Sequence, residues 1–143
     1  MSRKAPAVEG ATPFNRALVV EDDGLIAMTI EQALLDAGCA EVRLSASTVD
    51  AMDVLRAWHP DVVVLDVHLS DRNDGWAIAE LLRELGPSRP QIIFSTGAPD
   101  AIPPHVAELG SVLEKPYQAD ALIALLRQPA KSGLLSRIKN ALQ

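Results

Sequence analysis

A run of four apolar residues, Val62 to Leu65, constrains the fold more than any other stretch of the chain. Three of the four are β-branched valines, Pro60 and Asp61 precede them, and Asp66 follows. Such a short, bounded run is typical of a strand buried on both faces, as in a parallel sheet covered by helices. Asp66 then lies at the carboxyl end of the strand, where the functional residues of open α/β sheets gather. A plain strand-ending aspartate has the same local pattern, so the interpretation depends on the ends of the other strands.

Four further short apolar runs predict strands, at residues 17–20, 42–44, 91–96 and 111–115. Helical patterns separate them at residues 25–37, 51–58, 76–85 and 118–127, with only a short helix expected near residues 104–109. Five strands that alternate with helices imply an α/β fold with a parallel sheet built from right-handed crossover units.

The chain of 143 residues is long enough for one domain. We expect a flexible leader at residues 1–15, the domain at residues 16–128, and a linker plus a short amphipathic helix at residues 129–143. The last segment places apolar residues on one helical face: Leu134, Leu135, Ile138, Ala141 and Leu142. A helix this short needs a partner surface, either on its own domain or in a homodimer.

The net charge of −6 argues against a general binder of nucleic acid or anionic membranes. The single cysteine, Cys39, excludes an internal disulfide and a multi-cysteine zinc site, and we expect it to fill the core near a helix end. No apolar run reaches the ~18 residues of a membrane span, and residues 1–15 lack a signal-peptide core. The expected location is the cytoplasm.

Polar residues end or directly follow four of the predicted strands: Glu21 and Asp22, Asp66, Thr96, and Lys115. Parallel strands bring their carboxyl ends to one edge of the sheet, so these side chains are expected to converge. Clustered carboxylates repel one another unless a cation binds or their pKa values rise, and their oxygens suit Mg²⁺. Lys115 and Thr96 would stabilise an anionic oxygen such as that of a phosphoryl group.

This site suits in-line transfer of a phosphoryl group to a carboxylate, with the central Asp66 as nucleophile and an acyl phosphate as product. Blander interpretations exist for single residues. Glu21 and Asp22 are also typical of helix N-termini, and Lys115 of a surface charge. None of these interpretations explains why Glu21, Asp22, Asp66, Thr96 and Lys115 occur together.

The ordered set of motifs resembles the receiver domain of two-component response regulators: Val19–Asp23, Val64–Asp66, Asp74-Gly75, Ser95–Gly97 and Glu114–Tyr117. The resemblance covers residues 16–128. It implies a flavodoxin-like (CheY-like), doubly wound, five-stranded parallel sheet of order 2-1-3-4-5 with helices on both faces. It further implies a signalling switch rather than an enzyme, here expected to stand alone, with a sensor histidine kinase or phosphotransfer protein as donor and a downstream protein as target.

The resemblance also assigns roles to residues. Asp66 would be phosphorylated, and Asp22, Asp66 and the backbone carbonyl of His68 would hold Mg²⁺. Glu21 would act on the metal through a bound water. The side chain of His68 is expected to tune the access of hydrolytic water to the phosphoryl group.

By the same resemblance, Thr96 and Lys115 would bind phosphoryl oxygens and carry the switch. The family commonly has an aromatic residue three positions before its lysine, where this chain has Val112. The usual coupling of the threonine to an aromatic flip is therefore not expected here. Asp66–Leu69 and Ser95–Gly97 also faintly resemble receivers that serve kinases of the HWE type.

Three alternatives remain open at this point. The chain could act as a phosphate shuttle or sink, or as a pseudo-receiver that binds proteins without being phosphorylated. A Mg²⁺-dependent phosphatase of the haloacid dehalogenase type also uses an aspartate after an apolar strand. Such a phosphatase usually has a second aspartate two positions later, where this chain has His68.

Overall fold

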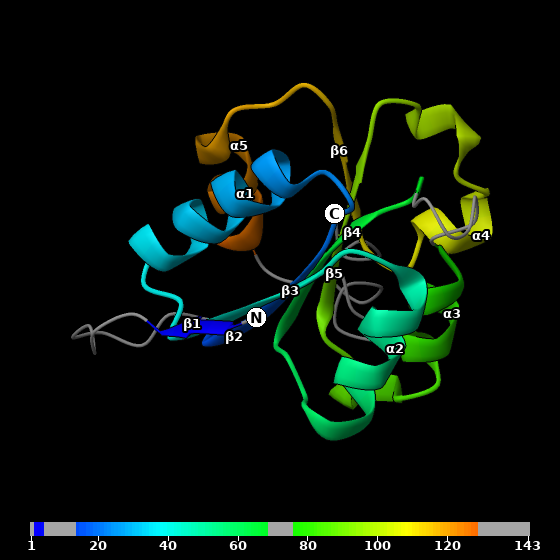
Figure 1. Ribbon diagram of the computed structural model, residues 1–143. Coiled ribbons are helices and arrows are strands. Elements are labelled where there is room, and N and C mark those ends of the chain that lie inside the picture. The colour runs from blue at the N-terminus through cyan, green and yellow to red at the C-terminus, as the bar shows by residue number, and fades with distance from the viewer. Residues whose placement is uncertain (1, 5–13, 69–75, 129–143) are drawn as a thin grey trace, which may run out of the picture.

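The structure, a computed structural model, describes residues 2–4, 14–68 and 76–128 (Figure 1). Six strands form one sheet: β1 (Ser2–Lys4), β2 (Arg16–Val20), β3 (Glu41–Ser45), β4 (Val62–Asp66), β5 (Gln91–Thr96) and β6 (Ser111–Glu114). The helices are α1 (Gly24–Asp36), α2 (Thr48–Ala57), α3 (Trp76–Arg83), α4 (Pro104–Ala107) and α5 (Ala119–Leu126), with short 3₁₀ helices at Gly86–Ser88 and Pro99–Ala101.

The strands lie in the order β1-β3-β2-β4-β5-β6, and the five from β2 to β6 are parallel. Numbered along the chain without β1, these five have the order 2-1-3-4-5, which confirms the predicted flavodoxin-like sheet. Helices α1 and α5 cover one face, and α2, α3 and α4 cover the other (Figure 1). Within the described ranges, no helix combines the length and apolar character that crossing a bilayer requires.

The run that ends in Asp66 is buried on both sides, as predicted. Val63 and Leu65 pack in the core beneath α2, α3 and α4, whereas Val62 and Val64 pack in the core beneath α1 and α5. Every residue of β4 is buried. Successive side chains of a strand point to opposite faces, so a continuous apolar run is what a sheet covered on both faces needs.

Local signals in the sequence set the ends of the helices. The Asp23 side chain accepts hydrogen bonds from the backbone amides of Leu25 and Ile26 at 2.9 and 3.1 Å and so caps α1. The predicted cap of α2 is also present, since the Ser47 hydroxyl accepts from the amide of Asp50 at 3.1 Å. Gly38, with φ of 104°, takes the left-handed conformation that often follows a helix. The short α4 agrees with the expected short helix.

The prediction of a flexible leader at residues 1–15 is wrong at two places in this range. Ser2–Lys4 form β1, which pairs antiparallel with β3 and covers what would otherwise be an open sheet edge. Phe14 is 1% exposed and belongs to the core beneath α1 and α5, because its ring is better buried than solvated. The predicted amphipathic helix at the carboxyl end lies outside the described residues.

Gly110 supports a prediction about the packing of this sheet. A Cβ atom at this position would lie 2.9 Å from the carbonyl carbon of Ile92 and closer still to its oxygen. We therefore expect Gly110→Ala to lower the free energy of unfolding by about 1–3 kcal/mol, because strand backbone cannot move aside cheaply. Urea unfolding would measure the effect, with Gly24→Ala as the control because its Cβ has no neighbour within 4 Å. Equal stability of the two variants would contradict the prediction.

Candidate functional site

The carboxyl ends of four parallel strands meet at one edge of the sheet. Val20 of β2 lies opposite Leu65 of β4, so Glu21 and Asp22 follow β2 beside Asp66. Further along the sheet, Thr96 lies opposite Glu114, directly before Lys115. The predicted convergence is therefore present for Glu21 and Asp22 after β2, Asp66 at the end of β4, and Lys115 after β6.

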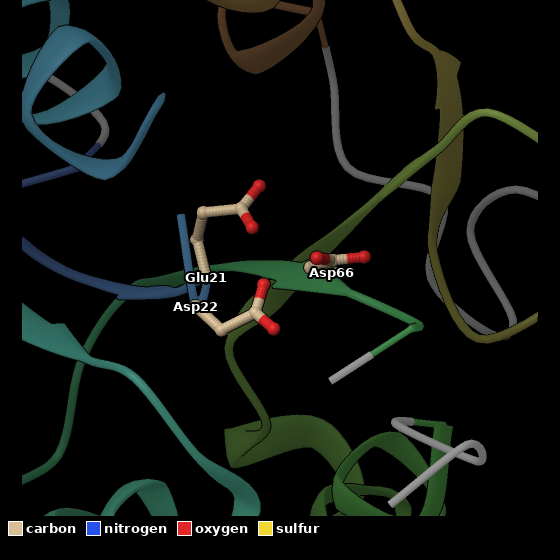
Figure 2. A group of neighbouring side chains, drawn as sticks. All are labelled: Glu21, Asp22 and Asp66. Atoms are coloured by element: carbon tan, nitrogen blue, oxygen red, sulfur yellow. The ribbon is translucent and has the colours of Figure 1, made fainter. Parts of the chain in front are cut away.

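Three carboxylates form the centre of this edge (Figure 2). Glu21, Asp22 and Asp66 each offer one oxygen, and these oxygens lie within 4.8 Å of one another. Glu21 and Asp66 are buried, at 4% and 6% exposed, whereas Asp22 is exposed. One carboxylate of the cluster therefore opens to solvent while the other two are held in the protein.

Lys115 places its ammonium between the two buried acids. Its Nζ donates to Glu21 Oε1 at 2.7 Å and lies 3.7 Å from Asp66 Oδ2. The peptide bond that joins Lys115 to Pro116 is cis. Lys115 is thus not a plain surface charge, since its side chain is only 24% exposed and faces the acids.

Burial is the largest single influence on the pKa values of both Glu21 and Lys115. Burial, together with the neighbouring Asp66 carboxyl, raises the pKa of Glu21 to about 7 despite the pull of Lys115. Burial alone would lower the pKa of Lys115, but the carboxylates of Glu21 and Asp66 outweigh it and raise the pKa above its ordinary value. Lys115 therefore stays charged, and an added cation would favour the ionised form of Glu21.

The spacing of the three acids can be compared with that of a magnesium site. Two oxygens on the same Mg²⁺ lie at most about 4.2 Å apart, since each Mg–O bond is about 2.1 Å. Adjacent ligands of an octahedral Mg²⁺ lie only about 3.0 Å apart, so oxygens that are up to 4.8 Å apart have to move closer by up to about 2 Å or bind the ion partly through water. The three carboxylates are the hard oxygen donors that a small divalent cation takes, and the donor set fits such an ion once they close in.

His68 and Thr96, the other two predicted site residues, make different hydrogen bonds. The backbone amide of His68 donates to Asp66 Oδ1 at 2.9 Å, while the His68 side chain is exposed. The Thr96 hydroxyl accepts from the amide of Ala98 at 2.9 Å, and Thr96 is fully buried. Thr96 thus lies at the end of β5 as expected, but the hydrogen bond recorded for its hydroxyl is to the loop that follows the strand.

The sequence interpretation assigned no role to Tyr117, which the structure connects to the site. Its hydroxyl and that of Ser95 lie 2.9 Å apart and form a hydrogen bond. Ser95 is the residue opposite Asp66 in the sheet, so this bond joins the segment after Lys115 to the strand beside the acids. The partners are 22 residues apart, and no local pattern could have revealed the contact.

The family model described as the response regulator receiver domain matches residues 17–127. The chain belongs to this family. It is the receiver domain of a two-component response regulator, and the fold and the predicted family are both confirmed.

Individual relatives agree with this assignment. The chain is 32% identical over 128 residues to Response regulator MprA of Mycobacterium avium (strain 104), covering 87% of this chain and 52% of that protein. The same protein of Mycobacterium sp. (strain KMS) is 33% identical over 116 residues, covering 78% and 49%. The chain thus spans about half the length of these curated relatives.

Solved structures show the same fold. A CheY-like receiver domain from Methylobacillus flagellatus superposes with a TM-score of 0.69 at 27% identity, covering 78% of this chain and 95% of that one. Chemotaxis response regulator CheY4 of Vibrio cholerae superposes with a TM-score of 0.65 at 23% identity, covering 78% and 94%.

Proposed function

We propose that Asp66 accepts a phosphoryl group from a sensor histidine kinase or a phosphotransfer protein, and that the acyl phosphate changes contacts with a downstream protein. One observation carries this proposal: a buried aspartate at the end of the central strand, with a lysine ammonium 3.7 Å away and two further acids beside it. Membership of the receiver family supports the role of this chain as the acceptor of the phosphoryl group.

In the proposed reaction, an oxygen of Asp66 attacks the phosphorus of the donor. The bond from phosphorus to the leaving nitrogen or oxygen breaks, and the leaving group takes its electron pair. The Lys115 ammonium stabilises the charge on the phosphoryl oxygens, because it lies close to Asp66 and stays protonated. Hydrolysis by water later returns Asp66 to the free carboxylate.

We propose that Mg²⁺ is held by Asp22, Asp66 and the backbone carbonyl of His68, with Glu21 acting through water. The ion would neutralise the charge that gathers on the transferring group. Support comes from the grouping of the three acids and from the burial of Glu21 and Asp66, whose charge a cation would compensate.

The switch is proposed to involve Thr96, Lys115 and the surface of α4, β6 and α5. Phosphorylation adds about two negative charges beside Lys115. The Thr96 hydroxyl accepts from the amide of Ala98, and a hydroxyl that accepts one bond can still donate its own hydrogen to a phosphoryl oxygen. Val112, 36% exposed on β6, stands where the family commonly has an aromatic residue, so the change must reach this surface by backbone movement or through other side chains.

A small phosphodonor tests the proposed function directly. The chain would be incubated with acetyl phosphate and Mg²⁺, and its intact mass followed with time. A receiver gains the mass of one phosphoryl group and loses it slowly. The absence of any adduct would favour a pseudo-receiver, and rapid consumption of acetyl phosphate without a lasting adduct would favour a phosphatase.

The metal site yields a prediction that needs no phosphodonor. We expect Mg²⁺ to raise the thermal midpoint of the wild-type chain, because a ligand that binds only the folded state stabilises it. Asp22→Asn should weaken Mg²⁺ binding about ten- to a hundredfold, since it removes one charge about 2–4 Å from the ion. Asp23→Asn is the matched control, because its amide oxygen can still cap α1. Equal shifts in all three proteins would contradict the assignment of Asp22.

The exposed His68 side chain gives a further prediction. It lies two residues after Asp66, and we propose that it limits the approach of water to the acyl phosphate. His68→Ala should therefore speed dephosphorylation, measured by the decay of the mass adduct after the donor is removed. An unchanged rate would contradict this role.

A further inference from the structure

A pair of hydroxyl groups, those of Ser95 and Tyr117, forms a hydrogen bond of 2.9 Å beside Asp66. Ser95 on β5 is the register partner of Asp66 on β4. Val64 and Ile93, two residues earlier on these strands, pack in the core beneath α1 and α5. Because side chains alternate along a strand, Asp66 and Ser95 point to this same face. Tyr117 packs against the same core, so its hydroxyl reaches Ser95 on the side of the sheet where Asp66 lies.

Burial makes this hydrogen bond costly to lose. Ser95 is 1% exposed, and a buried hydroxyl that is left without a partner destabilises the folded state. Burial also raises the pKa of the Tyr117 hydroxyl above its ordinary value, so the group keeps its proton at neutral pH. The pair therefore holds the Tyr117 side chain on β5.

The segment from Lys115 to Tyr117 is attached to β5 at two points. The last pair in the register of β5 with β6 is Thr96 with Glu114. Directly after it, the Lys115 amide donates to the carbonyl of Thr96 at 2.7 Å. Two residues later, the Tyr117 hydroxyl meets that of Ser95. Lys115 is thus held by a backbone bond at its own amide and by a side-chain bond just beyond its carboxyl side.

The start of α5 does not provide this second attachment. Within the described residues, the side chain of Gln118, which precedes α5, makes no capping hydrogen bond. The starts of α1 and α2, in contrast, are capped by the side chains of Asp23 and Ser47. The path of the chain between Lys115 and α5 therefore depends on the Tyr117 bond rather than on a helix cap.

The reaction proposed for Asp66 depends on where the Lys115 ammonium lies. Its Nζ is 2.7 Å from Glu21 Oε1 and 3.7 Å from Asp66 Oδ2, at the end of a long and flexible side chain. A backbone displacement of about 1 Å would move the ammonium relative to both acids, and a misplacement of this size can slow a reaction about 100-fold. A residue that fixes the backbone around Lys115 therefore influences the transfer rate without touching the phosphoryl group.

We propose that Tyr117 is a positioning residue for phosphoryl transfer, because its hydrogen bond to Ser95 holds Lys115 in reach of Asp66. This inference rests on the proposed phosphorylation of Asp66 and extends it to a residue outside the set of acids and the lysine.

Removal of either hydroxyl should slow formation of the adduct. Tyr117→Phe and Ser95→Ala each delete one side of the bond, and each should lower the initial rate with acetyl phosphate and Mg²⁺ about three- to tenfold. The double variant should be no slower than the slower single variant, because both changes break the same bond. Thr29→Val is the matched control. It deletes a hydroxyl that donates to the carbonyl of Leu25 at 2.8 Å on the exposed side of α1, and it should leave the rate unchanged.

The Lys115→Met background separates positioning from support of the fold. If Tyr117 acts through Lys115, Tyr117→Phe should have no further effect on the rate once Lys115→Met is present. Equal slowing by Tyr117→Phe in both backgrounds would overturn the proposal in favour of a structural role. An unchanged rate of Tyr117→Phe in the otherwise wild-type chain would overturn it as well.

Hydrogen exchange gives a measurement that needs no phosphodonor. Tyr117→Phe should speed exchange of the Lys115 amide several-fold, because the bond from this amide to Thr96 loses its neighbouring attachment. Unchanged exchange at this amide would overturn the proposal. If exchange sped up as expected but the wild type formed no adduct, the phosphorylation of Asp66 would be wrong, and with it any role of Tyr117 in transfer, whereas the attachment to β5 would stand.

Discussion

Asp66→Asn is expected to abolish formation of the phosphoryl adduct with acetyl phosphate and Mg²⁺. The amide cannot form the acyl phosphate that an ionised carboxylate forms, and no other group of the described cluster lies at the end of the central strand. The fold should survive, because an asparagine oxygen can still accept the hydrogen bond from the His68 amide. Intact mass spectrometry with time measures the outcome.

The control for this prediction is Asp61→Asn. Asp61 stands just before the same strand, is exposed, and accepts hydrogen bonds from the amides of Asn15 and Arg16 at 2.9 and 3.0 Å. An asparagine there can keep both bonds, and the adduct should form at the wild-type rate. An adduct of undiminished yield on the Asp66→Asn protein would show that the phosphoryl group goes elsewhere, and the proposed function would be wrong.

The sequence predicted the centre of the site because a regular sheet converts a sequence pattern into a position in space. Each parallel strand delivers the residue after its apolar run to the same edge, so Glu21, Asp66 and Lys115 could be placed together without knowing any distance. The same reasoning explains the success with β4, whose continuous apolar run fits only a strand covered on both faces.

Contacts between residues far apart in the chain could not be predicted in the same way. Lys115 Nζ lies 2.7 Å from Glu21 and 3.7 Å from Asp66. This difference depends on side-chain conformations, which the spacing of residues in the sequence does not reveal. The hydrogen bond from Tyr117 to Ser95 is of the same kind. β1 was missed because three residues carry no periodicity, and its pairing depends on the free edge of β3.

Lys115→Met is expected to slow formation of the adduct about 10²–10³-fold, the loss found when one charged or polar group that stabilises a developing oxyanion is removed. Its effect on the free energy of unfolding should be smaller, about 1–3 kcal/mol. Glu21 would lose its hydrogen-bonded counter-charge, but with a pKa already raised to about 7 it can take up a proton and stay neutral. Initial rates by mass spectrometry and urea unfolding measure the two quantities.

A second substitution separates the structural role of Lys115 from its role in phosphoryl transfer. In the double variant Lys115→Met with Glu21→Gln, the buried acid no longer needs a counter-charge, so most of the lost stability should return. The transfer rate should stay low, since no ammonium faces the phosphoryl oxygens. Lys115→Arg keeps the charge, but its planar guanidinium does not reproduce the position of Nζ between Glu21 and Asp66, so it should restore stability better than rate. If the double variant instead recovered the wild-type rate together with its stability, Lys115 would act only by neutralising Glu21.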